Sequence, residues 1–221
     1  MREAVGGEAD GAPGRAGGRH ARALLVDFGG VLTSNVFDSF REFCEREGLE
    51  PGAVKRLFRE DREALALLRR LERGELTEDA FSERFAPLLG VSDHDGLVDR
   101  LFAGMRADEA MLGAVRRARS AGIRTGLLSN SWGAGRYDRD AFPELFDGVV
   151  ISGEVGLHKP EPEIFRLAAE RVESAPESCV FVDDLKENCA GAEAVGMTAV
   201  LHRGAGATVP ELERLLGLTL R

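Results

Sequence analysis

The sequence predicts an α/β fold, in which a doubly wound, Rossmann-like core with a mostly parallel sheet carries an inserted group of helices. Short apolar runs without polar alternation recur along the 221 residues, as is typical of parallel strands that helices cover on both faces. Patterns with the period of a helix separate most of these runs. About residues 36–106 contain amphipathic helical patterns but no convincing strand, which indicates the insert.

The first predicted strand is residues 23–27, an unbroken apolar run that ends at Asp27. Gly29 and Gly30 follow it, and glycines permit the tight turn and the close ligand approach that a site at a strand end requires. Further apolar runs predict strands at residues 125–128, 149–151, 179–182 and 198–201. Helices are expected between them at residues 109–121, 160–172 and 186–195.

The chain is expected to divide into three parts. Residues 1–21 are rich in Gly and Ala and lack an apolar run, which predicts a disordered tail. Residues 22–35 and 107–221 should form the α/β core, and residues 36–106 a helical cap in which Thr77 is the N-cap of one helix. Because the insert enters directly after the first strand, it should lie over the edge where open α/β sheets bind ligands.

The composition argues against several classes of function. Basic residues number 29 and acidic residues 38, and the net charge of −9 argues against a nucleic-acid surface. No apolar stretch approaches the roughly 18 residues that span a bilayer. Cys44, Cys179 and Cys189 form no C-x-x-C pair and indicate reduced thiols in a cytoplasmic protein. We therefore expect a small-molecule substrate, no nucleic-acid or membrane partner, and a monomer or homodimer.

Polar residues that can carry chemistry lie at the ends of the predicted elements. They are Asp27, Ser129, Asn130, Lys159, Asp183 and Asp184. An Asp after a strand often caps a helix, so each alone has a simple explanation. Together, three carboxylates at one sheet edge repel unless a cation joins them, and Mg²⁺ is the hard cation that suits carboxylate and carbonyl oxygens. A lysine, a hydroxyl and backbone amides beside that ion would suit a phosphoryl group.

Four sequence motifs follow one another along residues 23–204. They are Val26-Asp27-Phe28-Gly29-Gly30-Val31-Leu32, Leu128-Ser129-Asn130-Ser131-Trp132, Gly156-Leu157-His158-Lys159-Pro160-Glu161-Pro162 and Phe181-Val182-Asp183-Asp184-Leu185-Lys186-Glu187-Asn188. With them the chain resembles the haloacid dehalogenase-like (HAD) superfamily of hydrolases. It is most similar to the branch that includes the phosphatase domain of soluble epoxide hydrolase and bacterial sugar 1-phosphate phosphatases. The resemblance implies a Mg²⁺-dependent phosphatase of a small phosphorylated metabolite, with a sugar 1-phosphate as one candidate.

The resemblance also implies roles for the motif residues in the reaction. Asp27 would attack phosphorus and form an aspartyl-phosphate, which water then hydrolyses. Ser129, Asn130 and Gly30 would bind the phosphoryl group. Lys159 would neutralise the phosphoryl charge and hold Asp27 in place.

The metal position contains one departure from the family. Mg²⁺ would be bound by Asp27, by the backbone carbonyl of Gly29 and by Asp184, with Asp183 beside them and Asn188 in support. Most phosphatases of the family carry a second Asp where this chain has Gly29, and that Asp protonates the leaving group. General acid catalysis is worth about 10²–10⁴ in rate.

The missing acid leaves several functions open. A leaving group that is stable as an anion would need little protonation, or the insert would supply an acid from among Glu60, Asp61, Glu63 and Glu72. Carbon–halogen hydrolysis needs no metal, and the Asp183–Asp184 pair argues against it. Carbon–phosphorus cleavage would need a Schiff-base lysine, and Lys55 is the only lysine of the insert. A non-catalytic module that binds phosphate esters is the remaining alternative.

Three further features have both a functional and a structural explanation. His158 is a candidate proton carrier, although a single histidine in a loop more often has no such role. Trp132 is expected either to contact substrate or to pack at the domain junction. Arg136, Tyr137 and Arg139 could contact an anionic substrate, but a solvated polar loop is the favoured expectation for them.

Overall fold

Five parallel strands form one sheet, in the order β3-β2-β1-β4-β5, in the computed structural model, which describes residues 21–133 and 137–221. The strands are β1 (Ala23–Val26), β2 (Arg124–Ser129), β3 (Gly148–Ile151), β4 (Cys179–Asp183) and β5 (Thr198–Leu201). All five occur where the apolar runs predict them, which confirms the fold class. The predicted tail, residues 1–21, lies outside the described residues except for Ala21.

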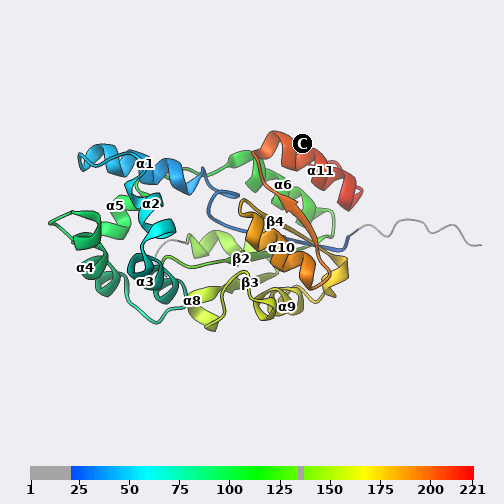
Figure 1. Cartoon of the computed structure of the whole chain (residues 1–221). Coiled ribbons are helices and arrows are strands. Elements are labelled where there is room, and N and C mark those ends of the chain that lie inside the picture. The colour runs from blue at the N-terminus through cyan, green and yellow to red at the C-terminus, as the bar shows by residue number, and fades with distance from the viewer. Residues whose placement is uncertain (1–20, 134–136) are drawn as a thin grey trace, which may run out of the picture.

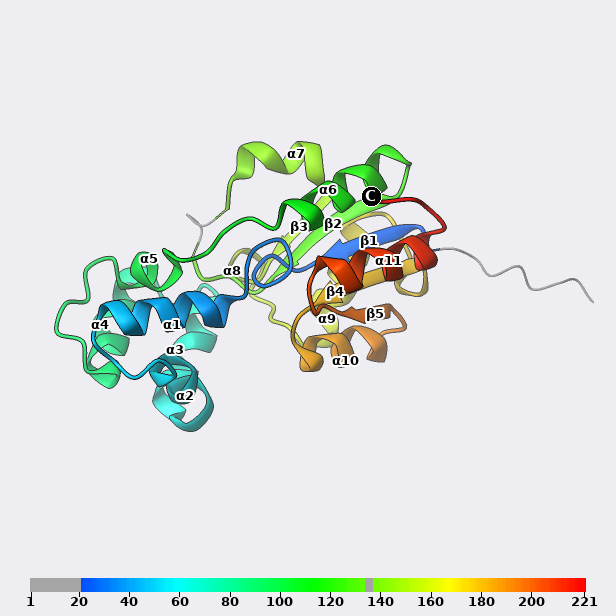
Figure 2. The ribbon, with the colours of Figure 1, turned by 90° about the horizontal axis from the view of Figure 1, so that it is seen from above.

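Helices cover both faces of this sheet (Figures 1 and 2). They are α6 (Glu109–Ser120) and α11 (Ala205–Leu216) on one face, and α9 (Pro162–Arg171) and α10 (Lys186–Ala194) on the other. Leu24 and Val26 of β1 pack in the cluster under the first pair, whereas Leu25 packs in the cluster under the second. Because both faces of the strand are buried, its sequence is an unbroken apolar run.

The ends of the predicted helices differ from the observed ends by no more than two residues. The sequence analysis did not identify α11 or the short helices α7 (Phe142–Leu145) and α8 (Ser152–Val155). Helices of four residues are too short to show a period, which explains the omission of α7 and α8.

The segment between β1 and β2 is helical in the structure. Before α6 this segment contains α1 (Val36–Arg46), α2 (Ala53–Glu60), α3 (Arg62–Glu72), α4 (Glu78–Leu89) and α5 (Leu97–Phe102), which together we call the helical insert. The insert has its own core, in which Phe43, Phe81 and Phe85 are fully buried. Thr77 is the N-cap of α4, as predicted, because its hydroxyl accepts a hydrogen bond from the Ala80 amide at 3.2 Å.

The two crossings between the helical insert and the rest of the chain lie side by side. Thr33 and Ala107 form an antiparallel bridge. The Ser34 amide donates to the Arg106 carbonyl at 2.7 Å, and the Asp108 amide donates to the Leu32 carbonyl at 2.9 Å. The chain therefore leaves the sheet after β1 and returns at almost the same point, at the carboxyl edge of the sheet (Figure 2).

Two predictions from composition can be compared with the described residues. None of their helices has both the length and the apolar character needed to cross a membrane. Cys44, Cys179 and Cys189 are buried free thiols, as the absence of a cysteine pair indicated.

Candidate active site

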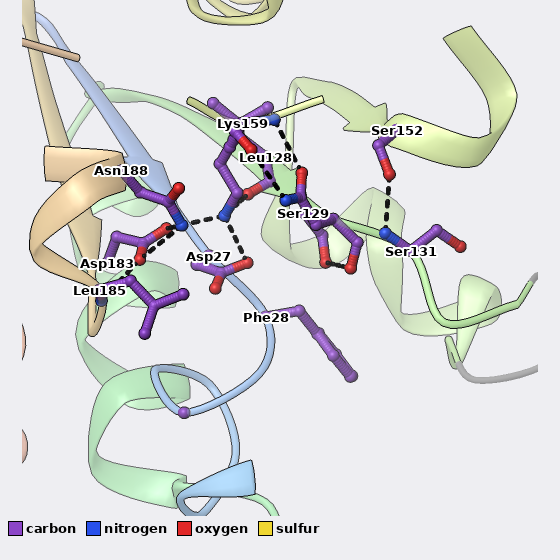
Figure 3. A network of polar contacts seen from close by, with 12 residues as sticks. Asp27, Phe28, Leu128, Ser129, Ser131, Ser152, Lys159, Asp183, Leu185 and Asn188 are labelled. Carbon is purple, nitrogen blue, oxygen red and sulfur yellow. Dashed lines mark hydrogen bonds and ion pairs between the residues drawn. The ribbon is translucent and has the colours of Figure 1, made fainter. Parts of the chain in front are cut away.

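The centre of the site is the ammonium group of Lys159, which is 1% exposed (Figure 3). Its Nζ lies 2.9 Å from Asp27 Oδ1 and 2.7 Å from Asp183 Oδ2, and it donates to the Leu128 carbonyl at 3.1 Å. Asp27 follows the last residue of β1, Asp183 is the last residue of β4, and these strands are neighbours at the centre of the sheet. From β1 the chain builds the sheet in one direction, through β2 to β3, and β4 and β5 then extend it on the other side of β1. The direction therefore reverses between β1 and β4, and open α/β sheets bind ligands at the carboxyl end of such a reversal.

Asp183 is fully buried and holds other groups of the site rather than facing the cavity. Its Oδ1 accepts hydrogen bonds from the Leu185 amide at 2.9 Å and from the Asn188 side chain at 3.0 Å. Its Oδ2 accepts from Asn188 as well as from Lys159. The side chain of Asn188, expected to support the metal, thus donates to both oxygens of Asp183.

The third carboxylate, Asp184, faces a cavity that Asp27 also lines. Oxygen atoms of Asp27, Asp183 and Asp184 lie within 4.8 Å of one another. One lysine does not balance three carboxylates, and hard oxygen donors at this spacing suit a divalent cation such as Mg²⁺. The donor set therefore fits the metal that the sequence predicts.

The raised pKa values of Asp27 and Asp184 also indicate that their ionised forms need a nearby positive charge. Burial raises the pKa of Asp27 to about 7 against the opposing charge of Lys159, and the charge of Asp183 adds to the rise. Burial and the charge of Asp183 raise the pKa of Asp184 to about 6. Burial alone would lower the pKa of Lys159, but the charges of Asp183 and Asp27 raise it above its ordinary value. A bound cation would favour the ionised carboxylates.

Gly30, in the turn after β1, lets the backbone of that turn lie close to the Asp184 side chain. Its φ is +78°, and a Cβ atom at this position would lie 2.5 Å from Asp184 Oδ2. Its amide, expected to bind the phosphoryl group, donates to the Thr33 hydroxyl at 3.1 Å. Gly29, the other member of the pair, lines the cavity beside Asp27.

Ser129 and Asn130 lie at the end of β2, on the opposite side of β1 from Asp183. The side-chain oxygen of Asn130 accepts from the Lys159 amide at 2.9 Å, and its side-chain nitrogen donates to the Lys159 carbonyl at 3.2 Å. Asn130 therefore fixes the backbone that carries the buried lysine. Tyr137 donates from its hydroxyl to Ser129 Oγ at 3.0 Å.

Tyr137 corrects one expectation. It is 8% exposed and packs its ring against Phe28, with 5.0 Å between centroids, so it does not lie in a solvated loop. Burial raises its pKa to about 12, and the tyrosine stays a neutral hydrogen-bond donor. Arg139 is exposed as expected, and Arg136 lies outside the described residues.

Glu72 is the acidic residue through which the helical insert lines the cavity, on the wall opposite the sheet. It ends α3, is 9% exposed, and its Oε2 lies 2.6 Å from His158 Nε2. The Ser152 hydroxyl of α8 donates to the Glu72 carbonyl and accepts from the Ser131 amide, which ties the end of α3 to the core (Figure 3 shows the second bond). The carboxyl group of Glu72 is thereby placed in the same cavity as Asp27.

The other charged residues considered in the insert do not reach this cavity. Glu60 and Glu63 are exposed, and Asp61 is the N-cap of α3, where it accepts from the Glu63 and Ala64 amides at 2.9 Å. Lys55 is exposed on α2, with its ammonium 4.6 Å from the centre of the Phe37 ring. Only proximity in the fold distinguishes Glu72 from these residues, because the sequence pattern around it is that of an ordinary helix end.

The cavity has a volume of about 790 Å³ and lies between the carboxyl edge of the sheet and the helical insert. Asp27, Ser129, Asn130 and Asp184 line it from the core. Apolar and aromatic side chains from both parts of the chain form most of the remaining wall. The site thus combines a buried lysine–carboxylate centre with a cavity of the size that small ligands occupy.

Three known proteins illustrate the relatives of this chain in sequence. Acyl-CoA dehydrogenase family member 10 of Mus musculus is 28% identical over 213 residues, which cover 92% of this chain and 20% of that protein. Sesquiterpene phosphatase astK of Aspergillus oryzae is 26% identical over 151 residues, which cover 66% of this chain and 77% of that protein. Bifunctional epoxide hydrolase 2 of Rattus norvegicus also matches, and the chain spans less than a quarter of its length.

Solved structures share the fold. A HAD family enzyme from Bacteroides thetaiotaomicron, solved as a magnesium complex, has a TM-score of 0.63 and 23% identity, covering 83% of this chain and 94% of that one. A family model described as haloacid dehalogenase-like hydrolase matches residues 21–196 of this chain. The resemblance seen in the four motifs is thus confirmed, and the chain belongs to the haloacid dehalogenase-like hydrolase family.

Proposed function

We propose that the protein is a Mg²⁺-dependent phosphomonoester hydrolase that works through an aspartyl-phosphate on Asp27, with the helical insert as its cap. The observation that carries the proposal is the buried ammonium of Lys159, 2.9 Å from Asp27, in a cavity that also contains Asp184. This centre combines a nucleophilic carboxylate with the positive charge that a phosphoryl group requires. The phosphatase among the relatives supports this class of reaction.

In the first half of the reaction, a carboxylate oxygen of Asp27 attacks phosphorus while the bond from phosphorus to the ester oxygen breaks. Asp27, Asp184 and the Gly29 carbonyl would hold Mg²⁺, which when bound neutralises charge on the phosphoryl oxygens. Lys159 keeps Asp27 oriented and adds a second positive charge. Ser129, whose hydroxyl accepts from Tyr137 and donates to the Asn130 carbonyl at 3.4 Å, can redirect that donated hydrogen bond to a phosphoryl oxygen.

The leaving oxygen must gain a proton if it comes from an ordinary alcohol. We assign this role to Glu72, because Gly29 offers no acid and Glu72, unlike the exposed lining residues Glu109 and Asp138, is buried in the wall of the cavity that Asp27 also lines. In the second half, water attacks the phosphorus of the aspartyl-phosphate, and Glu72 takes the proton of that water. Asp27 is regenerated, inorganic phosphate leaves, and Glu72 is protonated for the next cycle.

The alternatives each face an observation against them. Lys55 does not line the cavity, so the Schiff base that carbon–phosphorus cleavage requires has no lysine within the insert. A metal-free dehalogenase would have no use for the concentration of carboxylates at Asp27, Asp183 and Asp184. A binding module without turnover would not need a nucleophile held by a buried lysine. We further propose a cytoplasmic protein, in line with its free thiols.

Phosphate release with and without Mg²⁺ tests the proposal. The panel contains p-nitrophenyl phosphate, acyl phosphates, sugar 1-phosphates and sugar 6-phosphates. Asp27→Asn should abolish turnover while the far-ultraviolet circular dichroism stays unchanged, and Asp184→Ala should raise the Mg²⁺ concentration needed for half-maximal rate. Phosphate release that persists in Asp27→Asn, or an unchanged metal titration in Asp184→Ala, would contradict the assignment.

A further inference from the structure

We propose that the natural substrate carries its phosphate on an apolar alcohol, a hydrocarbon chain or ring system, rather than on a sugar. This inference rests on the proposed phosphatase function and concerns the part of the cavity that holds the leaving group. It replaces the expectation of a sugar 1-phosphate, which was drawn from the resemblance of the motifs and not from the cavity.

The wall on the side of the insert is aromatic. Trp132, from the loop after β2, reaches into the helical insert, where its ring centroid lies 5.6 Å from Phe40, 5.6 Å from Phe58 and 5.0 Å from Phe102. All four rings line the cavity. This answers the question left open by the sequence, because Trp132 both packs at the junction and faces the space where a leaving group would lie.

The wall on the side of the core is apolar as well. Leu112 of α6 and Phe142, Leu145 and Phe146 around α7 line this part of the cavity. Leu185, directly after Asp184, also lines it and is 41% exposed, the one large hydrophobic side chain of the described residues that is exposed to this degree. An exposed leucine beside a metal-binding carboxylate is costly in water and is useful against an apolar ligand.

Many of the polar groups in the wall already have partners. The Thr33 hydroxyl is engaged with Gly30 and Phe28, the Tyr137 hydroxyl with Ser129, and the Asn130 side chain with the backbone of Lys159. The charged lining residues Arg106, Glu109, Arg116 and Asp138 are exposed. A sugar hydroxyl that enters such a cavity without a partner weakens binding, whereas each buried methylene strengthens it.

The chemistry of the leaving group agrees with this substrate class. An aliphatic alcohol is a poor leaving group as an anion, so its ester requires a proton donor. Glu72, which lines the cavity together with Asp27 and the aromatic residues, is the donor assigned above. The replacement of the usual acid by Gly29 is then compatible with an ordinary alcohol as product.

Two apolar esters and two sugar esters test the inference. We would compare kcat/KM for cyclohexyl phosphate and n-decyl phosphate with kcat/KM for glucose 1-phosphate and glucose 6-phosphate, all with Mg²⁺. Since one methylene in an apolar pocket is worth about 10–200-fold, the apolar esters should exceed the sugar esters by at least about tenfold. Equal or higher kcat/KM for the sugar esters would overturn the inference and leave the phosphatase function standing.

Two leucines of α3 provide a variant and its control. Leu68 lines the cavity and Leu65 does not, both are half-buried, and neither belongs to the packed core of the insert. Leu68→Gln should lower kcat/KM for n-decyl phosphate by about tenfold, because an amide without a partner replaces apolar surface. Leu65→Gln should stay within about twofold of the wild type. Equal effects of the two substitutions would count against the inference.

Binding separates failure of the inference from failure of the proposed function. Trp132 is the only tryptophan of the sequence, so its fluorescence in the Asp27→Asn variant reports ligands in this cavity. If no ester is hydrolysed by the wild type but n-decyl phosphate binds Asp27→Asn more tightly than glucose 1-phosphate, the phosphatase function is refuted and the ligand class is supported. Absence of both turnover and binding refutes both.

Discussion

Lys159→Met removes the positive charge at the centre of the site while keeping a side chain of similar length. In the wild type, Lys159 is 1% exposed and lies 2.9 Å from Asp27 and 2.7 Å from Asp183. The substitution leaves two buried carboxylates without their shared cation, and breaking a buried pair in this way costs about 3–5 kcal/mol. For a protein of this size that loss corresponds to a fall in Tm of roughly 6–20 °C.

The loss should depend on pH in the metal-free protein. Burial already raises the pKa of Asp27 from 3.8 to about 7, and loss of the lysine removes a charge that opposes this rise. A carboxyl group whose folded pKa lies above its unfolded pKa destabilises the fold increasingly as pH rises from the unfolded value through the folded one. The variant should therefore lose less stability at pH 5, where Asp27 holds its proton and only the pair with Asp183 is broken, than at pH 8, where both pairs are broken.

The assay is thermal unfolding of metal-free wild type and Lys159→Met at pH 5 and pH 8, followed by circular dichroism. Lys186→Met is the matched control, because Lys186 is exposed and its removal should change stability by no more than about 0.5 kcal/mol. Addition of Mg²⁺ at pH 8 should recover part of the loss in Lys159→Met. A loss below about 1 kcal/mol at pH 8, or one that is the same at both pH values, would refute the reasoning.

Two further substitutions test the geometry of the site. Gly30→Ala places a Cβ atom 2.5 Å from Asp184 and should abolish the Mg²⁺ response, whereas Gly48→Ala, with a similar φ of +70° and no atom within 4 Å, should cost only about 1 kcal/mol of unfolding free energy. Glu72→Gln should lower kcat for alkyl phosphates by about 10²–10⁴ and remove the fall in rate at high pH that a general acid produces. An unchanged metal titration in Gly30→Ala, or an unchanged pH profile in Glu72→Gln, would contradict these expectations.

The strands and the strand-end residues could be predicted because each depends on a local pattern. A strand buried on both faces reads as an apolar run, and a parallel sheet brings every carboxyl end to one edge. That reasoning placed Asp27, Ser129 and Asp184 together without coordinates. It could not tell that Asp183 faces inward and holds Lys159, because two adjacent carboxylates in a loop have the same sequence pattern whichever one faces the cavity.

Residues that reach the site through tertiary packing had no distinguishing pattern. Glu72 differs from Glu60 and Glu63 only in that the end of α3 is held against α8 by Ser152. Tyr137 lies in a polar stretch, and its burial against Phe28 depends on how the chain returns after β2. Periodicity describes one element at a time, so it cannot report which elements meet.

The adjacent crossings at Thr33 and Ala107 have a consequence for how this architecture diversifies. The bridge between these residues closes the helical insert as a loop whose two ends already meet. The entropy of closing such a loop changes only slowly with its length, so a longer, shorter or different insert costs the sheet little. Substitution, lengthening or recombination within α1–α5 can therefore alter the aromatic wall, while Asp27, Lys159, Asp183 and Asp184 belong to the α/β core outside the insert.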